Sequence, residues 1–129
     1  MKPTIVILLS DKRSGSTMFE RELCKHPEIS HVGYTPHTYN ETHHWTMAAC
    51  LLGDEGNSQK NCMSYGSASS ARQYMIDGLV GNVPDFVAPD SNDELVFKGW
   101  QALCEKYAHP VFFEKSPQLI HRWDALELL

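Results

Sequence analysis

The sequence predicts an α/β fold with three layers, in which a central parallel sheet lies between helices. Two apolar, β-rich runs, at residues 4–9 and 111–113, each lead into a polar turn and then into a helical pattern. Parallel strands joined through helices have this arrangement. Between the two runs lie further segments with helical periodicity, so strands and helices are expected to alternate along one chain.

The first strand is expected at residues 4–9, because this run is apolar on both faces, as in a central parallel strand. A helix is expected over residues 17–25, with Phe19 and Leu23 four positions apart on one face. Residues 29–33 predict a short second strand. The first quarter of the chain therefore predicts the start of a βαβ unit.

The middle of the chain predicts two helices, over residues 41–52 and 70–80. Between them, residues 54–67 are polar and rich in Gly, Ser and Asn, which indicates an exposed loop. The clearest helix start is Ser91, because Glu94 three residues later completes a capping box. The apolar stripe that follows comprises Leu95, Val96, Trp100, Leu103 and Tyr107.

The second apolar run, residues 111–113, predicts a buried strand. Ser116 and Pro117 then begin a last helix as its N-cap and first residue. The apolar residues at the end of the chain need a cover that two or three strands do not provide. We therefore expect residues 1–129 to be the N-terminal portion of a single longer domain, so that the fold is apparently truncated.

Composition excludes several classes of function. The net charge of −5 argues against a general nucleic-acid or anionic-membrane surface. The sequence shows no signal peptide and no apolar stretch of about 18 residues. We expect a soluble, cytoplasmic protein without nucleic-acid or membrane partners.

The cysteines and histidines do not predict a metal site. The four cysteines have no CxxC spacing, which favours reduced thiols. His37, His43 and His44 lie close together in sequence but lack HxxxH or HExxH spacing, so we expect a surface or substrate-groove cluster. The three tryptophans fall on apolar helical faces and are expected in the core.

Residues 10–17, SDKRSGST, follow the first strand and resemble a phosphate-binding loop. The nucleotide P-loop has the pattern GxxxxGK[ST]. Gly15 and Thr17 keep their places, whereas Ser10 replaces the first glycine and Ser16 replaces the lysine. Backbone N–H groups and a helix N-terminus still bind anions without that lysine. The pattern therefore predicts an anion-binding loop that suits a terminal phosphate or phosphosulfate better than a magnesium triphosphate.

Two motifs resemble the sulfotransferase family. Residues 12–17, KRSGST, with a following helix that ends near His26 and Pro27, resemble the phosphosulfate loop of that family. Residues 112–117, FFEKSP, resemble a strand end of the carbohydrate and protein sulfotransferases. The family uses 3′-phosphoadenosine 5′-phosphosulfate (PAPS) as sulfuryl donor on a P-loop-like α/β fold. Both motifs occur in the expected order, each at a strand-to-helix junction.

The resemblance implies a donor site on the loop and no metal cofactor. The backbone from Ser14 to Thr17, with the hydroxyls of Ser16 and Thr17, would hold the 5′-phosphosulfate. Arg13 would neutralise the bridging oxygen, and Lys115 would reach the same region from the second apolar run. The donor-binding residues implied are Lys12, Arg13, Ser14, Gly15, Ser16 and Thr17.

The resemblance also implies a general base for an acceptor hydroxyl or amine, on a small molecule, carbohydrate or protein. The candidates are His37 first, Glu41 second and Glu114 third. Together with Arg13 and Lys115, His37 and Glu41 complete the expected catalytic residues. In the family a later strand and helix hold the donor's 3′-phosphate, so residues 1–129 are expected to carry only part of the donor site.

Two alternatives to a PAPS-dependent sulfotransferase remain open. A small-molecule kinase would use the same loop for a nucleotide, although the loop lysine and an evident magnesium-binding aspartate are missing. A non-catalytic fragment would keep the fold and lack the chemistry.

Overall fold

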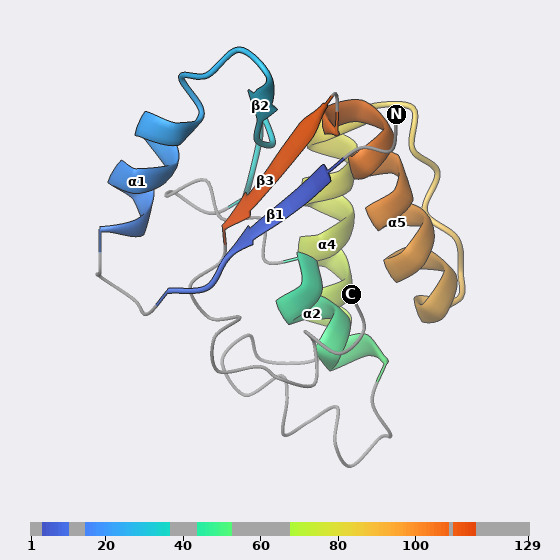
Figure 1. Cartoon of the computed structure of the whole chain (residues 1–129). Helices are drawn as coiled ribbons and strands as arrows, with labels where there is room; N and C mark the ends of the chain where they lie inside the picture. The colour runs from blue at the N-terminus through green and yellow to red at the C-terminus, as the bar shows by residue number, and fades with distance from the viewer. Residues whose placement is uncertain (1–3, 11–14, 37–43, 53–67, 109, 116–129) are drawn as a thin grey trace.

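The computed structural model describes residues 4–10, 15–36, 44–52, 68–108 and 110–115 (Figure 1). Both strands and helices occur along these residues, which confirms the predicted mixed α/β class. In chain order the elements are β1 (Thr4–Leu8), α1 (Ser16–Leu23), β2 (Ile29–Ser30), α2 (His44–Leu51), α4 (Ala68–Asn82), α5 (Asn92–Tyr107) and β3 (Val111–Lys115).

The three described strands form one parallel sheet in the order β1-β3-β2. Among the three described strands, β1 pairs with β3 alone and lies at one edge, whereas the sequence predicted a central strand. Ile5 and Val6 of β1 are each 39% exposed, whereas β3 is buried from Phe112 to Lys115. An apolar run indicates that a strand can be buried, but it does not say which strands will flank it.

Helices cover both faces of the sheet, as the three-layer prediction requires. Side chains alternate between the two faces of a strand. Phe113 of β3 meets Phe19 of α1, with ring centroids 6.5 Å apart. Its neighbour Phe112 stacks on Trp100 of α5 on the opposite face, at 5.6 Å. Figure 1 shows α1 on one side of the sheet and α2, α4 and α5 together on the other.

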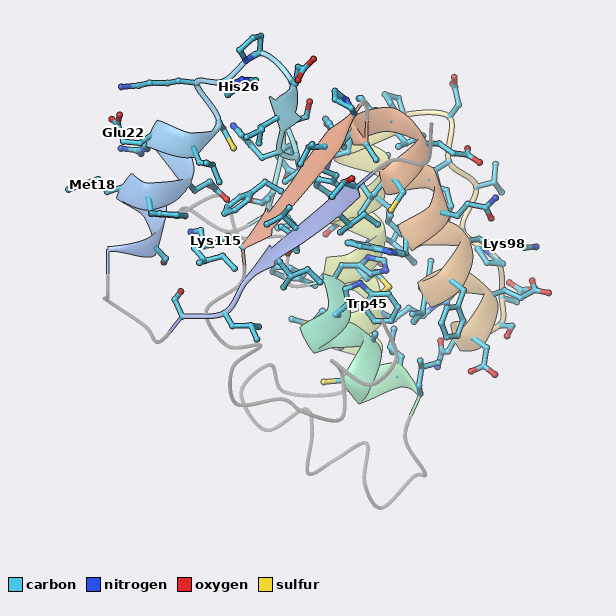
Figure 2. The ribbon with its side chains drawn as sticks, in the orientation of Figure 1. Met18, Glu22, His26, Trp45, Lys98 and Lys115 are labelled. Carbon is cyan, nitrogen blue, oxygen red and sulfur yellow. The ribbon has the colours of Figure 1, made fainter. Side chains whose placement is uncertain are left out.

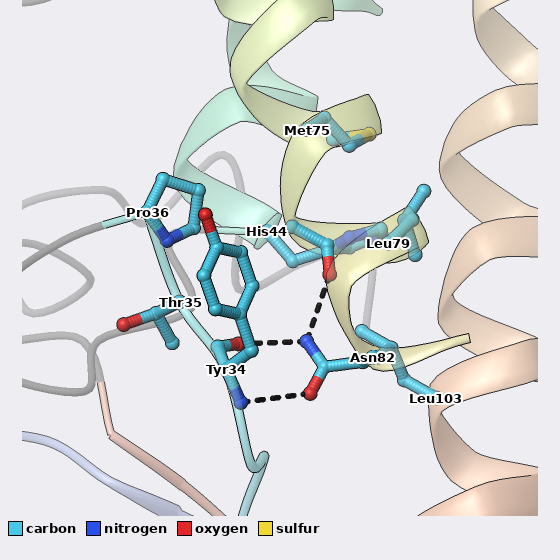
Figure 3. A pocket seen from close by; sticks show the side chains of 9 residues that line it. Tyr34, Thr35, Pro36, His44, Met75, Leu79, Asn82 and Leu103 are labelled. Atoms are coloured by element: carbon cyan, nitrogen blue, oxygen red, sulfur yellow. Dashed lines mark hydrogen bonds between the residues drawn. The ribbon is translucent and has the colours of Figure 1, made fainter. Parts of the chain in front are cut away.

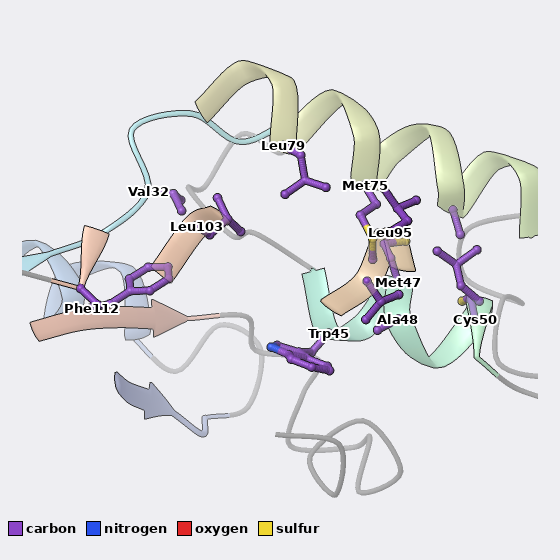
Figure 4. Close-up of a cluster of buried hydrophobic side chains, with 14 residues drawn as sticks. Val32, Trp45, Met47, Ala48, Cys50, Met75, Leu79, Leu95, Leu103 and Phe112 are labelled. Atoms are coloured by element: carbon purple, nitrogen blue, oxygen red, sulfur yellow. The ribbon is translucent and has the colours of Figure 1, made fainter. Parts of the chain in front are cut away.

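The hydrophobic core lies on the side of α2, α4 and α5 (Figure 4). Gly99 allows α5 to approach α4 closely, because a Cβ atom there would lie 2.6 Å from the Cδ1 atom of Leu79. The expected core positions of Trp45 and Trp100 are confirmed, and Trp123 lies outside the described residues. The buried members are Val32, Trp45, Met47, Ala48, Cys50, Leu51, Ala71, Met75, Leu79, Leu95, Val96, Leu103, Ala108 and Phe112.

The helix boundaries follow local sequence signals. Ser91 caps α5 as predicted, since its Oγ accepts a hydrogen bond from the Glu94 N–H at 3.4 Å. The α1 helix ends at Leu23, two residues before the predicted end, and α4 is two residues longer than predicted at each end. The predicted loop over residues 54–67 and the last helix lie outside the described residues.

His44 corrects the expected surface or substrate-groove cluster of histidines. Its side chain is buried in the core, where Nε2–H donates to the Val96 carbonyl at 3.0 Å. A histidine at the start of an apolar helix is drawn inside with the residues that follow it. His37 and His43 lie outside the described residues.

Cys24 and Cys104 are free cysteines. Within the part of the chain that the structure describes, no helix is both long and apolar enough to span a membrane.

Candidate functional site

The candidate site lies where β1 and β3 end side by side. The two strands are parallel, and Leu8 of β1 pairs with Lys115 of β3. Parallel neighbours place their carboxyl ends at the same edge of a sheet, where α/β proteins commonly bind ligands. The loop that follows β1 therefore starts beside the side chain that ends β3. At the start of this loop, the buried Ser10 Oγ has no hydrogen-bond partner among the described residues.

The loop enters α1 through Gly15, which has the left-handed backbone conformation φ 87°, ψ 14°. Gly15 occupies the N-cap position, and among the described residues no side chain caps the helix. The first N–H groups of a helix have no acceptor within the helix, and together with the helix dipole they attract anions. This helix start is therefore suited to a phosphate or sulfate oxygen.

Lys115 extends from β3 to this same helix start. Its Nζ donates to the Thr17 Oγ1 at 3.0 Å, a contact between residues 98 positions apart in the chain. Lys115 is 1% exposed, and Figure 2 shows it between the end of β3 and α1. An ammonium group and the positive end of a helix dipole thus face the same small region. Their fields add, and burial strengthens the attraction for an anion placed there.

Glu114, the third candidate for the base, lies on the opposite face of β3 from Lys115. It shares that face with Phe112, which stacks on α5. The charge of Glu114 reaches Cys104 of α5, whose pKa is raised to about 11 by burial and then by Glu114 and Glu105. Glu114 is therefore directed toward the core helices, away from the start of α1.

The structure brings together four of the predicted site residues: Gly15, Ser16, Thr17 and Lys115. Ser16 is buried beneath the helix start, and Thr17 is half-buried beside Lys115. The remaining predicted site residues lie outside the described residues, so their positions stay predictions. These are Lys12, Arg13, Ser14, His37 and Glu41.

Sequence reasoning missed Glu20, which is buried one helical turn after Ser16 on α1. Burial and the charge of Glu20 together raise the pKa of the Cys24 thiol. The i, i+4 spacing of Ser16 and Glu20 was a signal that both lie on one side of the helix. Glu20 therefore brings a buried acidic group close to the candidate site.

A small pocket lies elsewhere, between the segment after β2 and the helices α2, α4 and α5 (Figure 3). Its volume of about 10 Å³ has room for about one water molecule. It is too small for a substrate, and it contains none of the residues gathered at the sheet edge. Its lining comprises Tyr34, Thr35, Pro36, His44, Met75, Gly78, Leu79, Asn82 and Leu103.

Asn82, at the end of α4, fixes the segment beside this pocket. Its Oδ1 accepts from the Tyr34 N–H at 3.0 Å and from the Tyr107 hydroxyl at 2.7 Å. Its Nδ2 donates to the carbonyls of Tyr34 at 2.7 Å and Gly78 at 2.8 Å. All four hydrogen-bonding positions of this amide are used. The chain is thus held firmly just before residue 37, the leading base candidate.

In the part of the chain that the structure describes, no three His, Cys, Asp or Glu side chains cluster as possible metal ligands. Comparisons of the chain with protein-family models, with curated proteins and with solved structures found no match.

Proposed function

We propose that the edge formed by β1, β3 and the start of α1 binds the phosphosulfate of PAPS, and that the chain carries the donor-side part of a sulfotransferase. The observation that carries this proposal is the contact between the Lys115 Nζ and the Thr17 Oγ1 at 3.0 Å. It joins the two motifs that resemble the family, although they are far apart in sequence. Gly15 supports the proposal, because its left-handed conformation starts α1 without a capping side chain.

The proposed reaction is an in-line displacement at sulfur. An acceptor oxygen or nitrogen forms a bond to sulfur, while the bond from sulfur to the bridging phosphate oxygen breaks. Adenosine 3′,5′-bisphosphate leaves with the bonding electron pair, and a general base takes the acceptor proton. Charge develops on the bridging oxygen, so cations held there lower the barrier, as in phosphoryl transfer.

The chain's own residues have distinct parts in this proposal. The N–H groups at the start of α1 and the hydroxyls of Ser16 and Thr17 hold the nonbridging oxygens. Lys115 and Arg13 stabilise the leaving oxygen. His37 remains the first candidate for the base, followed by Glu41. The acceptor is a small molecule, a carbohydrate or a protein.

Thermal unfolding in the presence of adenosine 3′,5′-bisphosphate tests the proposal, with magnesium ATP as the competing ligand. A ligand at 100 times its Kd that binds only the folded state adds about 2.7 kcal/mol to the free energy of unfolding. We expect the bisphosphate to raise Tm and Arg13→Ala to abolish the rise. The matched control is Arg21→Ala, which removes an exposed arginine from the last turn of α1 and leaves the rise intact.

Other outcomes of the thermal-unfolding experiment would favour the alternative functions. A rise in Tm with magnesium ATP alone would favour a kinase. No rise with either ligand would reduce the chain to a non-catalytic fragment of the fold. If the bisphosphate binds, release of bisphosphate from PAPS in the presence of a panel of acceptors then measures the transfer itself.

A further inference from the structure

Residues 33–36 form a strap that lies along the last turns of α4 (Figure 3). Val32, just before the strap, is buried in the core. Gly33, Tyr34 and Pro36 of the strap are exposed, Tyr34 by 45%. The chain therefore leaves the core at the start of the strap and rests on the outside of the helix.

The strap is tied to the helices by hydrogen bonds to two side chains. The Tyr107 hydroxyl accepts from the Gly33 N–H at 3.0 Å and donates to the Asn82 Oδ1 at 2.7 Å. The Asn82 amide also binds the N–H and the carbonyl of Tyr34, at 3.0 and 2.7 Å. Tyr107 and Asn82 thus form one connected latch, in which each group orients the next.

Under the strap, α4 presents two glycines on one face, three positions apart. A Cβ atom at Gly81 would lie 2.1 Å from the Cδ1 atom of Tyr34, so the ring lies directly on the helix backbone. At Gly78 a Cβ atom would lie 3.6 Å from the Cδ atom of Pro36. The strap therefore rests on bare backbone at both positions.

The small pocket described above lies between the strap and the helices. Its volume is about 10 Å³, and its lining includes Tyr34 and Pro36 on one side and Met75 and Leu79 on the other. Atoms that face a void lose dispersion contacts. Packing therefore holds the strap less tightly than it holds the core beneath it.

We propose that the strap opens and closes as a single unit, and that Tyr107 and Asn82 are its latch. A segment with an exposed backbone and few buried contacts opens at a lower free energy than the whole fold. Because the two latch residues bind each other as well as the strap, loss of one hydrogen bond weakens the hold on the entire segment.

The opening has a consequence for the proposed reaction. Residue 37, the first candidate for the general base, directly follows the strap in sequence. An open strap does not fix its position, so the latch controls the acceptor side of the site. This consequence rests on the proposed function, whereas the opening of the strap does not.

Native-state hydrogen exchange of the ligand-free chain, followed by NMR, tests the inference. In the wild type, the Gly33 and Tyr34 amides are expected to share one opening free energy, lower than that of the Leu103 amide inside α5. Tyr107→Phe removes the hydroxyl and keeps the ring beside Phe112. It is expected to speed exchange about tenfold at both strap amides, although the Tyr34 N–H still has its own acceptor.

Gly81→Ala tests the same unit from the other side. Its methyl group would occupy the place of the Tyr34 ring, so it is expected to speed exchange at least about fivefold at Gly33 as well as at Tyr34. Gly78→Ala is the matched control, because its methyl group would lie at an ordinary contact distance from Pro36. It is expected to leave exchange at both strap amides unchanged.

Faster exchange at Gly33 alone in Tyr107→Phe would show separate hydrogen bonds and overturn the inference. Equal opening free energies for the strap and for Leu103 in the wild type would overturn it too, because the strap would then open only on global unfolding. If Tyr107→Phe does not fold, the wild type and Gly81→Ala still decide. Since no ligand is present, failure of the chain to bind adenosine 3′,5′-bisphosphate would contradict the proposed function alone.

Discussion

At the residue scale, Gly15 shows how one backbone conformation shapes the candidate site. Its φ of 87° lies in the left-handed region, which a residue with a Cβ atom adopts only at a cost of about 1–2 kcal/mol. A Cβ atom at Gly15 would meet no atom within 4 Å. Any change in stability caused by a Cβ atom at Gly15 therefore comes from the backbone conformation alone.

Gly15→Ala is expected to lower the free energy of unfolding by about 1–2 kcal/mol, because only the left-handed conformation is penalised. Gly15→Asn is expected to lower it less, since asparagine tolerates this conformation better. Urea denaturation measures both changes. The control is Gly78→Ala inside α4, where a Cβ atom would lie 3.6 Å from the Cδ atom of Pro36. Gly78→Ala is expected to raise the free energy of unfolding by about 0.5–1 kcal/mol. A change of the same sign for Gly15→Ala and Gly78→Ala would contradict the prediction.

At the element scale, the buried amide of Asn82 joins α4 to the segment after β2. The amide is 3% exposed, and its oxygen and nitrogen each serve two partners. Asn82→Asp keeps the shape and the acceptor oxygen, but it loses the two donors. The new carboxylate oxygen then faces the carbonyls of Tyr34 and Gly78.

We expect Asn82→Asp to lower the free energy of unfolding at neutral pH by at least about 2 kcal/mol, because buried carbonyls lose their donors. Urea denaturation measures the loss. Asn92→Asp is the matched control, since Asn92 lies in the first turn of α5 and accepts from the Arg72 guanidinium at 2.8 Å. A carboxylate there is next to a cation and a helix N-terminus, so this variant is expected to be neutral or stabilising. Equal losses for the two variants would show that the Asn82 contacts contribute little.

The sequence predicted most elements, because their signals are local. The Ser91 cap, the apolar stripe of α5 and the β-rich runs each depend on residues close together in the chain. The place of β1 at one edge of the described sheet was not predictable in this way. It depends on β3, a strand more than a hundred residues later, which inserts beside it.

At the scale of the whole molecule, the stability of the fold depends on pH because His44 is buried in the core. Burial lowers the pKa of this imidazole to about 4, from an ordinary value of 6.5. Between these two values the unfolded chain binds a proton that the folded chain does not. Stability is therefore full above pH 6.5 and falls as the pH drops toward 4.

The loss across this window is expected to be on the order of 3 kcal/mol from His44. Urea denaturation at a series of pH values measures it. His44→Gln keeps an N–H donor for the Val96 carbonyl and does not titrate, so its profile is expected to be flatter over the same window. Identical profiles for wild type and variant would place the pH dependence on other groups.

The sequence by itself determined the mixed α/β class, the approximate helices, the glycine at the start of α1 and the two motifs of the candidate site. Each follows from hydrophobic period, capping or turn chemistry within a few residues. Only the tertiary structure decided that β3 lies between β1 and β2, that His44 is buried, and that Lys115 donates to Thr17. These features depend on which distant segments pack together. Burial of the whole core decides which distant segments pack together, so a pattern within a few residues does not predict it.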